Sequence, residues 1–92
     1  MAVAFVLEIA GVTPQQIEAF NQRITPGGRA PEGQVFHAGG PTETGWVVVD
    51  VWESQEAFQR FVERATPIAQ ELGLPTDYQM LRTFQVYDML KA

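Results

Sequence analysis

The sequence has no cysteine and a single histidine, His37. The missing cysteines exclude disulfides, thiolate nucleophiles, zinc ribbons and iron–sulfur ligation. A lone histidine also excludes a multi-histidine metal site. We therefore expect no metal and no bound cofactor, so any chemistry must come from oxygen, nitrogen and aromatic side chains.

Basic residues are few and scattered, with six Lys and Arg against eleven Asp and Glu and a formal net charge of −5. An acidic surface repels phosphate backbones and anionic lipid, so we expect neither nucleic acid nor a membrane as a partner. The apolar residues 1–7 lack a basic start and are interrupted by Glu8. This run is too short for a signal peptide or a membrane span, and we expect a cytoplasmic location.

The chain of 92 residues, of which 46% are hydrophobic, has the size of one domain, residues 1–92. Alternating and periodic apolar patterns predict strands at 3–9, 34–39, 46–52 and 78–87, and helices at 14–24 and from 55 onward. Thr13 and Ser54 are predicted N-caps, and Thr66-Pro67 predicts a break or kink in the second helix, with a short helix after it that includes Ile68, Ala69 and Leu72. The order βαββαβ favours a ferredoxin-like α+β fold, with an antiparallel four-stranded sheet and both helices on one face.

The two central strands form a predicted hairpin whose faces differ in chemistry. One face carries Phe36, Ala38, Val47, Val49 and Val51, and the other carries Val35, His37, Gly39, Trp46, Val48, Asp50 and Trp52. We expect the first, wholly apolar set to pack under the helices. A turn centred near Thr42 and Glu43 would place His37 opposite Val48, with Asp50 and Trp46 as diagonal neighbours.

The second set would then lie on the bare face of the sheet. A face with two tryptophans invites aggregation unless it is covered. We expect a homodimer in which two such faces close a barrel, with a cavity between the subunits.

The residues of that face are the candidate site. His37 could be a general base or acid, and Asp50 could orient it. Trp46 and Trp52 could stack on a flat aromatic ligand, with Val35, Val48 and Arg82 as further contacts, Arg82 also being a possible partner for Asp50. The structural alternative is that His37 is a hydrogen-bonded core residue and both tryptophans are packing residues.

Two segments resemble a known family: His37-Ala-Gly-Gly-Pro-Thr-Glu-Thr-Gly-Trp46, and Val49-Asp-Val-Trp-Glu-Ser-Gln-Glu-Ala-Phe58. They are similar to small actinobacterial-type proteins of the dimeric α+β barrel superfamily, of the antibiotic biosynthesis monooxygenase (ABM)-like group. Haem-degrading members carry a tryptophan and a histidine on the helices, where this chain has Phe61 and, approximately, Glu71. The resemblance therefore implies the fold but not haem chemistry.

The resemblance implies a small-molecule cavity and two functions. The first is a cofactor-independent monooxygenase, or a cyclase or isomerase, acting on an aromatic or polyketide-like metabolite. The alternative is a non-catalytic ligand-binding or structural dimeric barrel. The sequence leaves open whether the protein is an enzyme.

Overall fold

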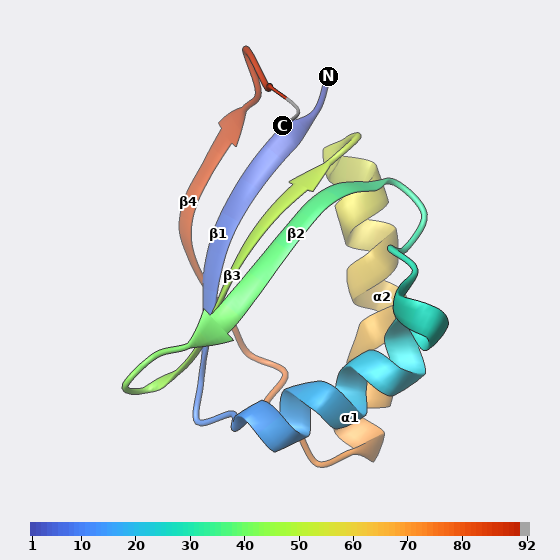
Figure 1. Cartoon of the computed structure of the whole chain (residues 1–92), viewed down its shortest axis with the longest axis vertical. Helices are drawn as coiled ribbons and strands as arrows, with labels where there is room; N and C mark the ends of the chain where they lie inside the picture. The colour runs from blue at the N-terminus through green and yellow to red at the C-terminus, as the bar shows by residue number, and fades with distance from the viewer. Residues whose placement is uncertain (91–92) are drawn as a thin grey trace.

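The computed structural model describes residues 1–90, which fold into one sheet with two α-helices on the same face (Figure 1). The elements are β1 (Val3–Ala10), α1 (Pro14–Ile24), the short 3₁₀ turn η1 (Pro26–Gly28), β2 (Gln34–Pro41), β3 (Gly45–Trp52), α2 (Gln55–Glu71) and β4 (Gln79–Gln85). The strand order is β2-β3-β1-β4 and every neighbouring pair is antiparallel. This confirms the predicted ferredoxin-like α+β fold.

Helix α1 begins where its capping residues predict. The Gln16 backbone N–H donates to the Thr13 hydroxyl at 3.2 Å, and the Thr13 backbone N–H donates to the Gln16 side chain at 2.9 Å. Pro14 occupies the first turn, where its missing N–H costs nothing. The reciprocal bonds fix the entry of the chain into a helix whose apolar face turns toward the sheet.

Helix α2 continues through Pro67, so the predicted break is wrong. The ring of Pro67 leaves the Glu63 carbonyl without its usual donor. The apolar stripe nevertheless continues on both sides of the proline, because Ala65 and Ala69 are both buried. Packing of that stripe against the rest of the molecule outweighs the local penalty.

The β2–β3 hairpin pairs His37 with Asp50, not with Val48 as predicted. The Thr42 N–H donates to the Gly45 carbonyl at 2.9 Å, which centres the turn one residue later than expected. When the centre of a hairpin turn shifts by one residue, each residue of one strand pairs with a residue two positions further along the other strand. The correct register therefore brings the imidazole and the carboxylate directly opposite one another.

The two faces of the sheet are also reversed relative to the sequence prediction. Trp52 is completely buried beneath the helices, whereas Phe36 and Val49 are 51% and 38% exposed on the bare face. The core is the cluster Phe5, Leu7, Trp52, Ala57 and Phe58. Alternation separated the two sets correctly except at Val35, where the register of β2 shifts. It did not say which set the helices cover, because each set contains enough large apolar side chains to be buried.

Candidate functional site

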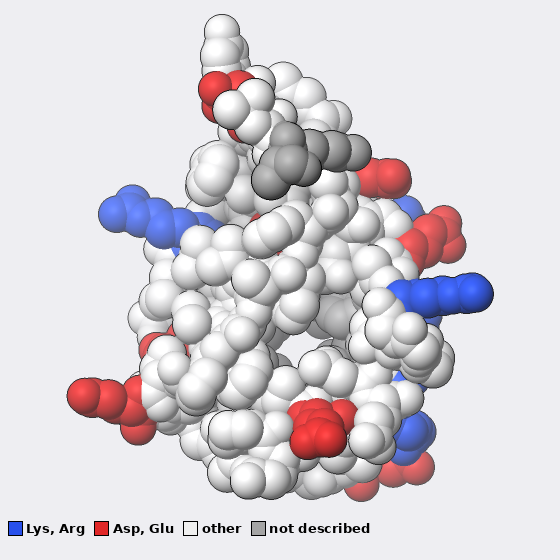
Figure 2. Space-filling model, viewed as in Figure 1, with Lys and Arg blue, Asp and Glu red and all other residues white. Residues whose placement is uncertain are grey.

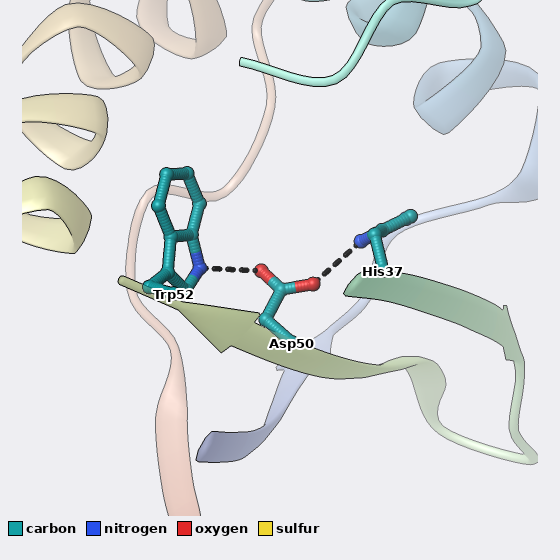
Figure 3. A network of polar contacts seen from close by, with 3 residues as sticks. All are labelled: His37, Asp50 and Trp52. Atoms are coloured by element: carbon teal, nitrogen blue, oxygen red, sulfur yellow. Dashed lines mark hydrogen bonds and ion pairs between the residues drawn. The ribbon is translucent and has the colours of Figure 1, made fainter. Parts of the chain in front are cut away.

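Asp50 is the centre of a short polar network under the helices (Figure 3). Its Oδ1 lies 2.6 Å from His37 Nδ1, and its Oδ2 accepts from Trp52 Nε1 at 3.1 Å. The side chain of Asp50 is only 6% exposed, whereas that of His37 is 45% exposed. A carboxylate in this environment is tolerated because both of its oxygens have partners.

The same network sets the protonation of the histidine. The hydrogen bond to Asp50 raises the pKa of His37 above its ordinary 6.5, burial opposes this rise, and the negative charge of Asp50 adds to it. With Nδ1 directed at the carboxylate, the neutral ring carries its proton on Nδ1 and leaves the Nε2 lone pair available. The arrangement therefore provides an oriented base whose pKa is held above its ordinary value by the carboxylate beside it.

His37 and Asp50 lie in the wall of a pocket inside one subunit, between the sheet and both helices, with a volume of about 220 Å³. The space-filling view shows an opening in the middle of the molecule that is bordered mainly by uncharged residues, while most charged side chains project from the outer edge (Figure 2). We call this the inner pocket; its apolar lining includes Leu7, Ile9, Ile17, Phe20, Ile24, Trp46, Val48, Phe58, Phe61, Val62 and Ala65. An apolar cavity with two convergent polar groups is the usual form of a small-molecule site.

The structure brings together four of the predicted site residues. His37, Trp46, Val48 and Asp50 line the inner pocket. Trp52 does not line it but packs behind it, against Phe58 and Phe61, and holds Asp50 through its indole N–H.

Two predicted residues lie elsewhere. Arg82 pairs across strands with Val6, which in turn pairs with Val49, so all three share the bare face away from His37. Val35 sits at a register irregularity in β2 and is 42% exposed outside the pocket. The predicted Arg82–Asp50 pair is wrong, because Asp50 faces the helices and bonds to His37 and Trp52.

The cavity itself differs in place from the prediction. We expected it between two subunits, but helices α1 and α2 of the same chain form its far wall. No helix residue was predicted as part of the site, so the sequence prediction missed that Phe20, Ile24 and Phe61 line the pocket. The sequence did contain one signal for the pocket, the carboxylate of Asp50 in a valine-rich strand. A carboxylate in such a strand must face either polar partners or a cavity.

Within residues 1–90, no group of three or more His, Asp or Glu side chains is placed to hold a metal ion. In the same range, no helix has both the length and the apolarity to cross a bilayer.

Comparisons with known proteins identify the fold. No family profile matches the sequence, and a search of curated proteins gave no significant match. Among solved structures, the chain is similar to SnoaB, a cofactor-independent oxygenase from Streptomyces nogalater, with a TM-score of 0.64, 21% identity and coverage of 99% and 98% of the two chains.

Two further structures show the same likeness. A putative antibiotic biosynthesis monooxygenase from Chloroflexus aurantiacus has a TM-score of 0.61 at 12% identity, covering 99% of this chain and 98% of its own. A dimeric ferredoxin-like protein of unknown function from Thermobifida fusca has a TM-score of 0.61 at 15% identity, covering 94% and 92%. The chain therefore has the fold that ABM-like proteins share.

Proposed function

We propose that the chain is a homodimeric, cofactor-independent enzyme that binds a hydroxylated aromatic or polyketide-like compound in the inner pocket, where His37 transfers a proton. The observation that carries this proposal is the His37–Asp50 contact of 2.6 Å in the wall of a mainly apolar pocket. The likeness to SnoaB, described as a cofactor-independent oxygenase, supports oxygenation as the reaction.

In the proposed reaction the substrate itself supplies the electrons. His37 Nε2 removes the proton of an acidic hydroxyl, and the resulting anion is electron-rich enough to reduce O₂. A new C–O bond forms at a ring carbon as a peroxide, which takes the proton back from His37. Loss of water then breaks the O–O and C–H bonds and leaves a quinone carbonyl. The net change of a hydroxyarene and O₂ to a quinone and water balances.

Asp50 and Trp52 act on this step as positioning residues. The carboxylate holds the ring so that Nδ1 carries the proton, and it stabilises the cationic imidazole formed when Nε2 accepts a second one. The Trp52 indole holds the carboxylate from the opposite side. The apolar walls supplied by α1 and α2 reduce the contact of the reacting anion with water.

The homodimer is proposed through the bare face of the sheet. Phe84 and Phe36 are 58% and 51% exposed there. Ala4 and Val51 lie between them across the sheet, and Val49 lies two residues from Val51 on the same face. Exposed aromatic residues on one continuous surface are typical of an interface. The Thermobifida fusca protein, described as dimeric, supports this assembly.

Oxygen uptake with 1-naphthol or anthrone tests the function. We expect protein-dependent uptake of one O₂ for each quinone formed, over a protein-free control. His37→Ala should lower kcat by about a hundredfold or more, the usual contribution of a positioned acid–base group. Val35→Ala, on the same strand but outside the pocket, is the matched control and should retain full activity.

Two results would contradict the proposal. Undiminished turnover in His37→Ala would exclude proton transfer by this residue. Tight binding of the aromatic probes without turnover in the wild-type protein would leave a ligand-binding protein in place of an enzyme.

A further inference from the structure

The inner pocket has a neighbour on the outside of the molecule. A groove runs along α1 and the η1 turn and includes Pro14, Glu18 and Pro26. We call it the outer groove. Ile17, Asn21, Thr25 and Trp46 line both the groove and the inner pocket. The two spaces are therefore separated by a single layer of side chains.

Trp46 is the largest residue of that layer, and it differs from Trp52 in its burial and in the hydrogen bonding of its indole N–H. Trp52 is fully buried and its Nε1–H is fixed on Asp50. Trp46 is partly exposed, and within the described residues its indole N–H has no protein acceptor. The Trp46 ring is thus held by packing alone, and its donor is free to meet a ligand.

The packing that holds Trp46 depends on Gly39 of β2. A Cβ atom built at Gly39 would lie 2.6 Å from Trp46 Nε1 and 3.4 Å from its Cε2. Real Cβ atoms do not approach so closely, so the indole lies over Gly39 only because this residue has no side chain. The neighbouring Gly40 has nothing within 4 Å of its Cβ position.

The volume of the inner pocket limits what it can enclose. A cavity of about 150 Å³ lined by aliphatic and aromatic residues holds one benzene ring. At about 220 Å³ the inner pocket has room for about one further fused ring. The rest of a three-ring ligand must extend past Trp46 into the outer groove.

We propose that Trp46, lying over Gly39, is the partition that sets the size of the ligand: two-ring aromatics fit on the inner side, and larger ones must displace the indole. This inference rests on the proposed function, since it takes the ligand to be aromatic. The polar lining of the groove, with Glu18 and Asn21, suits a hydroxylated end that reaches the solvent side.

The test is the ratio of dissociation constants for 1-naphthol and anthrone, measured by calorimetry on the full chain under argon. Trp46→Ala joins the two spaces and should favour anthrone by about tenfold relative to 1-naphthol. Gly39→Ala keeps the indole but forces it to move, and should change the ratio by about threefold or more. Gly40→Ala is the matched control and should leave the ratio unchanged.

A second measurement needs no ligand. Gly39→Ala should shift the tryptophan emission maximum, since Trp46 changes its surroundings while Trp52 does not, and Gly40→Ala should not. Thermal unfolding checks that each variant is folded.

The outcomes separate this inference from the proposed function. An unchanged ratio in both Trp46→Ala and Gly39→Ala, with 1-naphthol still binding, overturns the partition and leaves the proposed function standing. A shifted ratio without turnover supports the partition and contradicts the enzyme. If neither probe binds the wild-type protein, both proposals fall.

Discussion

At the scale of single residues, the carboxylate of Asp50 organises the site. Its two oxygens have two different partners, His37 and Trp52, and the Asp50 side chain is 6% exposed. Removing one partner of a buried charge leaves the other without compensation. A substitution at Asp50 should therefore change both the stability of the fold and the protonation of His37, and both must be measured.

Replacing Asp50 by Asn should lower the pKa of His37. The neutral amide weakens the hydrogen bond to the ring, which is the main cause of the raised pKa, and it also removes the negative charge that favours the imidazolium. NMR titration of the single histidine ring should show its midpoint moving to lower pH than in the wild-type protein. Glu43→Gln, in the exposed β2–β3 turn, is the control. A midpoint that stays in place would exclude Asp50 as the cause of the raised pKa.

The raised pKa of His37 also predicts how stability depends on pH. Because the folded state holds the proton more tightly than the unfolded chain, the pair contributes stability that is fully present below pH 6.5. That contribution is lost as pH rises through the higher folded pKa. Melting temperatures from pH 5 to 9 should therefore fall toward those of His37→Gln as the pH increases. Parallel curves for the two proteins would contradict this linkage.

At the scale of elements, the helix caps were predictable from the sequence, while the exact turn of the hairpin, its register and the facing of the sheet were not. The N-caps Thr13 and Ser54 act as their local sequence indicates, because capping bonds join residues three apart. The hairpin register was missed by two because the turn itself decides it, through the Thr42 N–H bond to Gly45. Which face of the sheet is covered depends on contacts with helices that are distant in the sequence. The alternation of residues within one strand carries no information about those contacts.

Pro67 inside helix α2 allows a test of whether tertiary packing outweighs the local helix-breaking preference of proline. Pro67 removes one backbone hydrogen bond from an exposed position of a continuous helix. Pro67→Ala restores that bond but loses the restriction that proline places on the unfolded chain, and the net gain should be about 1 kcal/mol. Urea unfolding measures it, with Gln70→Ala as a nearly neutral control. A destabilised Pro67→Ala would show that the ring is required by packing.

At the scale of the whole molecule, the two faces of the sheet carry different features. The helix-covered face carries the His37–Asp50 network, and the bare face carries exposed aromatic residues. The sequence predicted a dimer through one face and a cavity at the same face. In the structure the cavity lies on the helix-covered face, whereas the proposed interface is the bare face. The proposed dimer and the proposed site can therefore be altered independently.

A charge on the bare face should therefore split the dimer without harming the site. Val49→Lys places an ammonium at the centre of the proposed interface, where burial without a partner is strongly unfavourable. Sedimentation at low micromolar concentration should show a dimer for the wild-type protein and a monomer for this variant. Gln59→Lys, on an exposed position of α2, should stay dimeric. A wild-type monomer would contradict the proposed assembly.

The central claim is that an aromatic ligand binds inside the subunit, against His37. The most direct test is a two-dimensional amide and imidazole NMR titration with 1-naphthol. We predict the largest shifts at the His37 ring and at pocket residues such as Val48 and Phe61. Shifts confined to the bare face, at Phe36, Val49 and Phe84, with the His37 ring unmoved, would contradict the claim.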